Sequence, residues 1–472
     1  MTTQIPDHVF RGYDLRGLVG EELDGPRVEV LGKAYATWLL KRRIYDCVLG
    51  YDSRNSSPEF ARAMTKGLIE SGITVYDLGY SLSQIVYFAN YYFRTRGGVM
   101  ITASHNPKEY NGFKFCTGYS ETMLTEDIVE FRDLVKSGKF TTKLPKGEYI
   151  QQDIFPEYAK DLLRRIEPIK KFKVVIDACA GTPGLFLPNL LRQAGCEVIE
   201  QNTKLDSNFP VGTPDPTERE VQERLAKGVV LQKADLGFSY DNDGDRIGIV
   251  DETGALIWND TLVSLFSRDI LDYLPGAKIV YNTLCSKQVD DVIRATGGIP
   301  VIWLTGHSFI KAKVREERAP FGGELSGHIY FVDNFYGHDD GAYATLRLLA
   351  YLTRINKSLK QAVEELPHYV SSPEIKVGCP DAVKFQIVSE KIAAEIKKLY
   401  PKAKYVEIDG VRMDTKDEML IVRASQNGPY LTVKFEGKTE SAYNLLRKQV
   451  SQILHQFSEI DFTSGANIKA LD

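Results

Sequence analysis

Three aspartates stand close together in the segment that covers residues 240–246, Tyr-Asp-Asn-Asp-Gly-Asp-Arg. Because carboxylates this close repel one another, the cluster is hard to sustain unless a cation neutralises it. Asp241, Asp243 and Asp245 could place three oxygens on one hard ion such as Mg²⁺ or Ca²⁺. Arg246 follows at once and offers a planar guanidinium to a phosphate or carboxylate. The combination indicates phosphate chemistry.

Other interpretations of the acidic cluster are open at this point. An EF-hand loop would place the three aspartates at its first, third and fifth positions and Glu252 at its last. Its sharp turn requires glycine where this chain has Arg246. The flanking segments 236–240 and 247–250 also have the apolar, β-branched or aromatic character of strands rather than of helices. A solvated acidic turn and the D-x-D motif of a nucleotide-sugar transferase are the remaining alternatives.

A second motif combines a strand with a cluster of small polar residues. The apolar run 97–101 leads into Thr-Ala-Ser-His-Asn, and Pro107 ends regular structure there. This pattern predicts a tight turn that presents the hydroxyl of Ser104 at the tip of a loop, a common place for reactive groups in α/β proteins. Most serines in such a position only form turns. For His105, a structural and a catalytic role are both open. The chain has no G-x-S-x-G elbow, so a serine hydrolase is disfavoured.

Together the two motifs resemble those of the α-D-phosphohexomutase family, and of its phosphomannomutase/phosphoglucomutase branch in particular. The segments that carry the resemblance are, in chain order, F-R-G-Y-D-L-R-G (10–17), T-A-S-H-N-P (102–107), Y-N-G-F-K (110–114), D-N-D-G-D-R (241–246), G-H-S (306–308), G-G-E-L-S-G-H (322–328), D-G-V-R (409–412) and R-A-S (423–425). The family usually has D-G-D-G-D-R as its metal loop. The order of the segments is the family's own, which makes the set specific although no single segment is.

The resemblance implies a role for each of a series of residues. Catalytic roles fall to Ser104 as a phosphoserine, to Arg16, Arg246 and Lys114 as cations facing the phosphoryl group, and to Lys114 or His328 as acid/base. The metal would be Mg²⁺, with Asp241, Asp243, Asp245 and a phosphate oxygen on Ser104 as ligands. The substrate would contact Tyr13, His307, Glu324, Ser326, His328, Arg423, Ser425, Gln426 and Asn427.

The implied activity interconverts hexose 1-phosphate and hexose 6-phosphate through a 1,6-bisphosphate, and hexose 1,6-bisphosphate would serve as activator. G-E-L-S-G-H resembles the G-E-M-S-G-H of enzymes that use mannose and glucose more than the G-E-Q-S-G-H of the phosphoglucosamine branch. A phosphoglucosamine mutase and a non-catalytic sugar-phosphate-binding paralogue are the alternatives. The last loop, residues 423–429, reads R-A-S-Q-N-G-P, and Asn427 stands where the family usually has threonine.

The elements that must position these residues follow a repeated pattern. Strand, helix and strand alternate three times, as in βαβ units, and a unit with two strands between two helices follows. The predicted elements are strands 48–54 and 74–78 around helix 58–70, strands 173–177 and 197–199 around helix 185–194, strands 278–281 and 300–304 around helix 286–295, helices 382–399 and 441–457, and strands 418–423 and 430–436.

The predicted fold class is α/β: three similar mixed α/β domains and a smaller α+β C-terminal domain, which by the resemblance surround a central cleft. The predicted domains are 1–151 with the phosphoserine loop, 152–254 with the metal loop, 255–368 with the sugar-binding loop and 369–472 with the phosphate-binding loop. Segments 143–147 and 367–373 are predicted linkers.

Composition supports a multidomain enzyme and restricts the classes of partner that it can bind. The chain has 472 residues, a net charge of −4 and 43% hydrophobic residues. This charge disfavours nucleic-acid binding. Six cysteines without C-x-x-C spacing indicate free thiols in a reducing compartment. Because the chain shows neither an export signal nor a long apolar run, we expect a cytoplasmic protein without membrane insertion. The expected partner is a small-molecule sugar phosphate, and the expected assembly is a monomer or weak homodimer.

Overall fold

The computed structural model describes residues 4–426 and 428–472 and divides into two compact units. Unit 1 contains the chain up to Asn259 together with Ser326–Ala362, and unit 2 contains Asp260–Leu325 together with Val363–Asp472. Within the described residues, no helix has the length and apolar character needed to cross a membrane.

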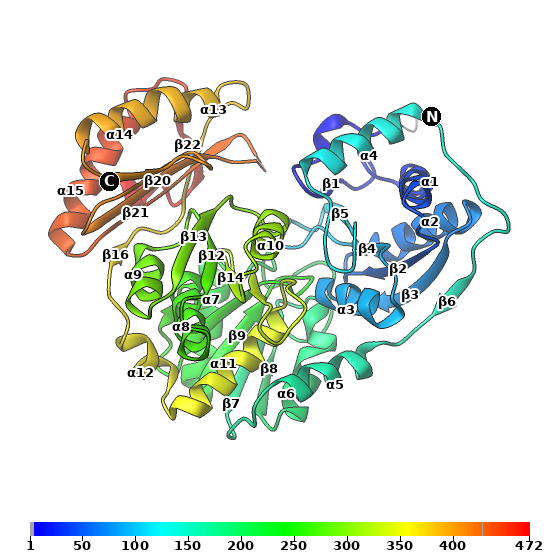
Figure 1. Cartoon of the computed structure of the whole chain (residues 1–472), viewed down its shortest axis with the longest axis horizontal. Helices are drawn as coiled ribbons and strands as arrows, with labels where there is room; N and C mark the ends of the chain where they lie inside the picture. Colours follow the sequence, from blue (N-terminus) through cyan, green and yellow to red (C-terminus); the bar gives the residue numbers. More distant parts are fainter. Residues whose placement is uncertain (1–3, 427) are drawn as a thin grey trace. The chain divides into compact units, whose positions relative to one another are not determined.

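The first sheet of unit 1 has six strands in the order β1-β5-β4-β2-β3-β6 (Figure 1). Strands β2, β3, β4 and β6 run parallel to their neighbours among these four, whereas β5 is antiparallel to β4 and β1. Its strands are β1 (Leu15–Leu18), β2 (Asp46–Tyr51), β3 (Thr74–Tyr80), β4 (Gly98–Ile101), β5 (Tyr110–Phe115) and β6 (Tyr149–Gln151), and its helices are α1 (Gly25–Lys41), α2 (Ser57–Glu70), α3 (Ser83–Phe93) and α4 (Thr125–Ser137).

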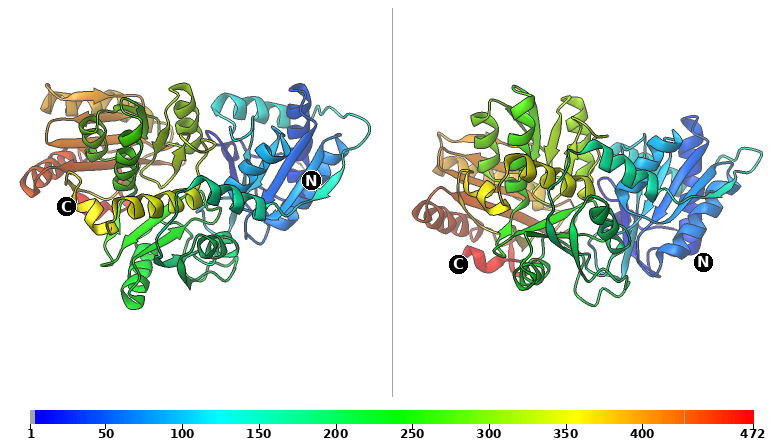
Figure 2. Two further views of the ribbon diagram at one scale, coloured as in Figure 1. Left: turned by 60° about the horizontal axis from the view of Figure 1, so that its bottom comes forward. Right: turned by 90° about the horizontal axis from the view of Figure 1, so that it is seen from below.

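Successive side chains of the central strands are buried on opposite faces of this sheet. Leu49 and Ile101 join one core with apolar residues of α1, α2 and α4, whereas Val48 and Met100 are buried outside that core. Since successive residues of a strand point to opposite faces, Val48 and Met100 lie on the other face, where α3 packs. Figure 2 shows this sheet, in blue and cyan, with its helices from two further directions. Burial of each such side chain stabilises the fold by about 1.5–3 kcal/mol.

The second sheet of unit 1 has five strands in the order β11-β10-β9-β7-β8. Its elements are α5 (Phe155–Arg165), β7 (Lys173–Asp177), a 3₁₀ turn (Thr182–Leu185), α6 (Leu187–Gln193), β8 (Glu197–Gln201), α7 (Arg219–Gln232), β9 (Leu236–Tyr240), β10 (Ile247–Asp251) and β11 (Leu256–Ile257). Strands β9 and β10 form an antiparallel hairpin in which Tyr240 pairs with Ile247. The acidic cluster is the turn of this hairpin, and therefore it is not an EF-hand loop. Unit 1 also contains β15 (Ile329–Phe331) and α11 (Gly341–Ile355).

Unit 2 contains a parallel sheet and an antiparallel sheet. In the first, β12 (Lys278–Asn282) pairs in parallel with β13 (Ile299–Trp303) and β14 (Phe321–Gly323), beside α8 (Asn259–Tyr273), α9 (Lys287–Ala295) and α10 (His307–Glu316). The second is a seven-stranded sheet. Its elements are β16 (Val370–Ser371), β17 (Ile375–Gly378), β18 (Lys404–Val406), β19 (Val411–Asp414), β20 (Glu418–Ala424), β21 (Tyr430–Gly437) and β22 (Asp461–Ala466), with helices α14 (Ala393–Leu399) and α15 (Glu440–Leu454).

The predicted fold class is confirmed, since three mixed α/β sheets precede an antiparallel C-terminal sheet. Two details differ from the prediction. The helix expected over 382–399 consists of α13 (Lys384–Gln386), a π-helical stretch (Ile387–Ile392) and α14. The expected linker 367–373 contains β16, whose Val370 pairs with Gly437 of β21, because β17 pairs only with residues 430–433 of β21 and leaves the end of that strand available. The domain boundaries remain predictions. All six cysteines are free and buried.

Candidate active site

The two motif loops of unit 1 follow parallel strands. The Ser104 loop comes after β4, which is parallel to β2, and the acidic loop comes after β9, which is parallel to β7. Loops at the carboxyl ends of parallel strands are the usual site of ligand binding in α/β folds. Here the two loops come from different sheets and meet.

Ser104 makes direct contact with the acidic loop. Its Oγ donates a hydrogen bond to Oδ2 of Asp241 (2.6 Å) and lies 3.1 Å from Nδ1 of His105. The residue has a left-handed backbone (φ 49°), and its amide donates to Oγ1 of Thr102 (2.7 Å). The side chain is not exposed at a loop tip, as the sequence suggested: the residue is only 1% exposed, because the acidic loop covers it.

The three aspartates of the acidic loop can hold a metal ion. Asp241, Asp243 and Asp245 are buried, and each offers a carboxylate oxygen within 4.8 Å of those of the other two. Gly244 has a positive φ of 73° that lets the hairpin turn bring them together. Within the described part of the chain, the Oδ1 atoms of Asp243 and Asp245 have no hydrogen-bond partner. Buried oxygens without partners are costly, so these residues fit a hard divalent cation.

A single lysine offsets part of this negative charge. Lys114, on β5, donates to Oδ2 of Asp243 (2.6 Å) and to Oδ2 of Asp245. Burial lowers the pKa of Lys114, but the two carboxylates outweigh burial and the net shift is upward. Burial and the neighbouring Asp243 and Asp245 raise the pKa of Asp241 well above its usual range. Lys114 and the guanidinium of Arg246, whose Nε lies 4.0 Å from Oδ2 of Asp241, face three carboxylates, so an excess of negative charge remains that a metal cation would relieve.

Two arginines border the loops. Arg16 pairs through Nε with Asp14 (2.9 Å), and its Nη1 donates to Oδ1 of Asn106 (2.5 Å) in the Ser104 loop. The backbone N–H of Arg246 donates to Oδ1 of Asp241 (3.1 Å). Tyr13 lies close enough to both guanidinium groups to interact with them electrostatically. Arg16 therefore contacts the Ser104 loop, and Arg246 contacts Asp241, the hydrogen-bond partner of the Ser104 hydroxyl.

His328 is held between an arginine and an aspartate. Nε of Arg246 donates to Nε2 of His328 (3.0 Å), and Nδ1 of His328 lies 2.9 Å from Oδ2 of Asp339. Because an arginine N–H can only donate, Nε2 carries the lone pair, and in the neutral ring the proton is on Nδ1, facing Asp339. Asp339 was not predicted as a site residue, although the consecutive acids Asp339 and Asp340 before α11 are visible in the sequence. Asp245, His328 and Asp339 form a second group with metal-ligand spacing. We favour the three-aspartate group because His328 and Asp339 already pair with each other.

Unit 2 brings together the predicted sugar and phosphate residues. Oε2 of Glu324 accepts from the amide of Gly306 (2.9 Å), directly before His307, and both side chains are buried. Nε of Arg423 donates to Oδ2 of Asp409 (2.9 Å), which also accepts from the amide of Thr305 (3.0 Å). Asp409, which was not predicted as a site residue, thus connects the two segments.

Four further residues were predicted to contact the substrate: Ser326, Ser425, Gln426 and Asn427. Ser425, in unit 2, is buried, and its amide donates to the carbonyl of Tyr430 (3.0 Å); Gln426 beside it is half-buried. Ser326 lies in unit 1 and is half-buried. Asn427 lies outside the described residues.

Three family models match successive parts of the chain. Residues 7–142, 156–254 and 258–369 match domains I, II and III of the models described as phosphoglucomutase/phosphomannomutase, alpha/beta/alpha.

Individual relatives agree with these matches over nearly the whole chain. A phosphomannomutase/phosphoglucomutase of Pseudomonas syringae pv. tomato is 36% identical over 437 residues, which is 93% of each chain. A phosphoglucomutase of Neisseria gonorrhoeae is 32% identical over 94% of this chain and 96% of its own. The crystal structure of a phosphoglucomutase/phosphomannomutase family protein from Burkholderia thailandensis superposes with a TM-score of 0.88 at 31% identity, covering 96% of this chain and 98% of that one.

Proposed function

Because this chain belongs to the phosphoglucomutase/phosphomannomutase family, we propose that it moves a phosphoryl group between the 1- and 6-positions of a hexose phosphate by way of Ser104. The observation that carries the proposal is the contact between the Ser104 hydroxyl and Asp241, 2.6 Å apart. It joins a nucleophile to a group of carboxylates that fits a metal ion.

The aspartates Asp241, Asp243 and Asp245, with an oxygen of phosphorylated Ser104, would hold Mg²⁺. When bound, the ion supplies positive charge to the phosphoryl group during transfer. Arg16 and Arg246 add fixed positive charge beside the same serine, which is the main means of catalysis in phosphoryl transfer.

The transfer proceeds in two steps without net hydrolysis. In the first, the bond between phosphorus and Oγ of Ser104 breaks, a hydroxyl oxygen of the hexose monophosphate bonds to phosphorus, and the hydroxyl proton passes by way of a base to Oγ of Ser104. In the second, Oγ of Ser104 bonds to the phosphorus of the other phosphoryl group of the resulting 1,6-bisphosphate, and the bond between that phosphorus and the hexose oxygen breaks. The Ser104 proton passes to the freed hexose oxygen, and the isomeric monophosphate leaves. A free hexose 1,6-bisphosphate can enter at the same point, which explains its role as activator.

His328 is the better candidate for the base. The upward pKa shift of Lys114 keeps its ammonium protonated beside Asp243 and Asp245, so Lys114 acts as a cation. The lone pair on Nε2 of His328 accepts from Nε of Arg246 in this structure, so Arg246 must release it before the ring can accept a proton, and Nδ1 lies 2.9 Å from Oδ2 of Asp339. A histidine with one nitrogen beside a carboxylate can accept a proton on the other once that nitrogen is released by Arg246.

The substrate class can be tested directly with purified protein. We expect glucose 1-phosphate and mannose 1-phosphate both to be converted to their 6-phosphates in coupled assays primed with glucose 1,6-bisphosphate, and glucosamine 1-phosphate to react more slowly. Preference for glucosamine 1-phosphate would favour the phosphoglucosamine branch. Binding without conversion of any of the three would favour the non-catalytic paralogue and contradict the proposal.

Glu324→Gln tests the sugar contacts of unit 2. We propose that this carboxylate binds sugar hydroxyls, and loss of its charge should lower kcat/KM about 10- to 100-fold for glucose and mannose phosphates alike, since a hydrogen bond to a charged group contributes roughly 1.5–3 kcal/mol. Steady-state kinetics on both substrates measure the effect. Glu316→Gln, on the surface of α10, is the matched control and should behave as wild type. Wild-type kinetics of Glu324→Gln on both sugars would place Glu324 outside the substrate site.

A further inference from the structure

Arg54 is a buried arginine of unit 1 that no step of the proposed reaction uses. It follows β2, and the residue is only 1% exposed. A buried guanidinium is costly unless its donors are all satisfied. The hydrogen-bond acceptors around its guanidinium therefore indicate which segments Arg54 stabilises.

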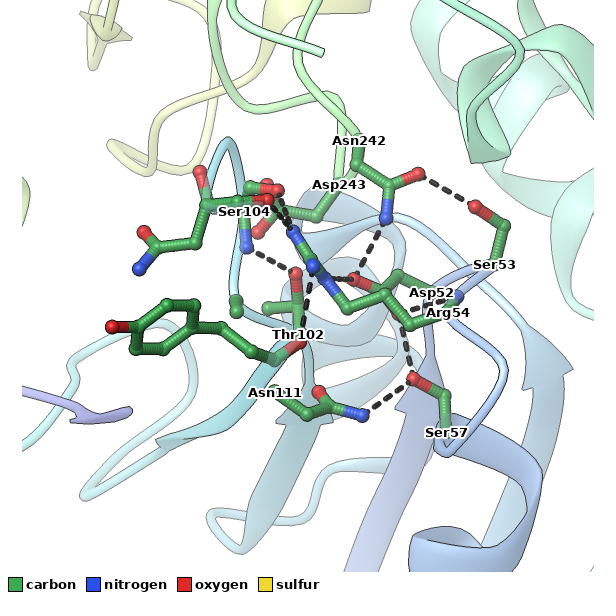
Figure 3. Close-up of polar contacts among 12 residues, drawn as sticks. Asp52, Ser53, Arg54, Ser57, Thr102, Ser104, Asn111, Asn242 and Asp243 are labelled. Atoms are coloured by element: carbon green, nitrogen blue, oxygen red, sulfur yellow. Dashed lines mark hydrogen bonds and ion pairs between the residues drawn. The ribbon is translucent and has the colours of Figure 1, made fainter. Parts of the chain in front are cut away.

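All of the side-chain donors of Arg54 are occupied, and most of them bind the Ser104 loop. Nη2 donates to the carbonyl oxygens of Ser104 (2.7 Å) and Asn106 (2.6 Å). Nη1 donates to those of Pro107 (2.7 Å) and Tyr110 (3.0 Å). Nε donates to Oδ2 of Asp52 (3.1 Å). Figure 3 shows Arg54 beside Asp52 and Ser104. An arginine has five N–H donors, so none is left for a phosphoryl group.

The turn that Arg54 holds needs such support. Ser104 has a φ of 49°, a left-handed conformation that costs a non-glycine residue about 1–2 kcal/mol. Conformations of this kind persist only where surrounding contacts determine them. Four carbonyls bound to one planar group fix both the path of the turn and the direction in which the serine side chain leaves it.

A second set of hydrogen bonds joins the same arginine to the metal loop. Oδ2 of Asp52, the partner of Arg54, also accepts from Nδ2 of Asn242 (2.8 Å), which lies between Asp241 and Asp243. The amide oxygen of Asn242 accepts from Oγ of Ser53 (2.7 Å). Asn242 and Asp52 are fully buried. This asparagine stands where the family motif usually has glycine, which has no side chain for such contacts.

We propose that Arg54, Asp52 and Asn242 form a positioning relay that sets the Ser104 turn and the metal loop in register for phosphoryl transfer. The relay rests on the proposed function, and none of its members touches the phosphoryl group. In-line transfer requires nucleophile, metal and leaving oxygen to be placed to within a fraction of an ångström. The relay would fix the relative positions of the two loops without contacting the reacting atoms.

Arg54→Lys tests the first half of the relay. Lysine keeps the charge but offers three donors in place of five, so at least two acceptors lose their partner. We expect transfer from phosphorylated Ser104 to hexose 6-phosphate, followed by quenched flow, to slow about a hundredfold, with KM close to wild type. Amide hydrogen exchange in residues 103–112 should become about tenfold faster or more. Arg347→Lys, which alters a buried arginine bound to Asp333 (2.7 Å) in the same unit, is the matched control and should change neither quantity.

Asn242→Ala tests the second half and covers the case in which Arg54→Lys fails to fold. It should weaken Mn²⁺ binding, measured by electron paramagnetic resonance, about tenfold or more, as loss of a group supporting metal ligands generally does. Wild-type transfer and exchange in folded Arg54→Lys, or wild-type Mn²⁺ binding in Asn242→Ala, would overturn the relay. If the wild-type protein transfers no phosphoryl group, the proposed function fails, whereas loop exchange and Mn²⁺ binding still decide whether the relay exists.

Discussion

Replacing Ser104 with alanine is expected to lower turnover of hexose phosphates by about ten-thousandfold or more, since removal of a nucleophile takes away the covalent route altogether. The Ser104 hydroxyl, 2.6 Å from Asp241, is the group that the proposal assigns to the phosphoryl transfer. Coupled assays measure the loss. Alanine removes only the oxygen, so the variant should remain folded with the same circular dichroism spectrum.

The location of the phosphate is the second part of this test. Wild-type protein treated with glucose 1,6-bisphosphate should gain one phosphate, and peptide mass spectrometry should place it on Ser104. Ser137→Ala, at the exposed end of α4, is the matched control and should keep full activity and the phosphate. A phosphate on another residue, or full activity of Ser104→Ala, would contradict the mechanism.

Asp243→Ala is expected to lower activity by about a thousandfold, because it removes one of the three carboxylates proposed to hold the metal. The same carboxylate accepts from Ser83 (2.6 Å) and from Lys114 (2.6 Å), so its loss also removes one of the two carboxylate partners of the ammonium. Assays over a range of Mg²⁺ concentrations, together with Mn²⁺ binding by electron paramagnetic resonance, measure activity and metal affinity separately. Asp133→Ala, a surface substitution on α4, should leave both unchanged.

Removal of the metal should have the same effect on the wild-type protein. Excess chelator is expected to abolish turnover, and added Mg²⁺ should restore it, because the ion would supply positive charge to the migrating phosphoryl group. Undiminished turnover in chelator would show that the aspartates act without a metal.

The sequence predicted those parts of the candidate site whose residues lie close together along the chain. The acidic loop and the Ser104 turn each lie within a short segment between strands, where hydrophobic pattern and turn-forming residues determine the local structure. Strands β7, β9, β12 and β20 accordingly lie where the pattern placed them. The breaks in the helix over 382–399 and the small strand β16 escaped detection, because backbone partners elsewhere in the chain decide such details.

Contacts between distant segments could not be derived from the order of residues. Ser104 looked like a loop tip in the sequence, yet the acidic loop of the next domain buries it. Asp339 became the partner of His328, and Asp409 the partner of Arg423, only through the packing of separate elements.

Arg54 and Asn242 show the same division between sequence and tertiary structure most clearly. The sequence by itself determined the family motifs, the α/β fold class and the two chemical groups, a serine and three carboxylates, since each is a local pattern. Only the tertiary structure decided that a buried arginine binds the serine turn and that an asparagine joins it to the metal loop. The physical reason is that a buried polar group must find its hydrogen-bond partners in space, and those partners are set by how sheets and loops pack.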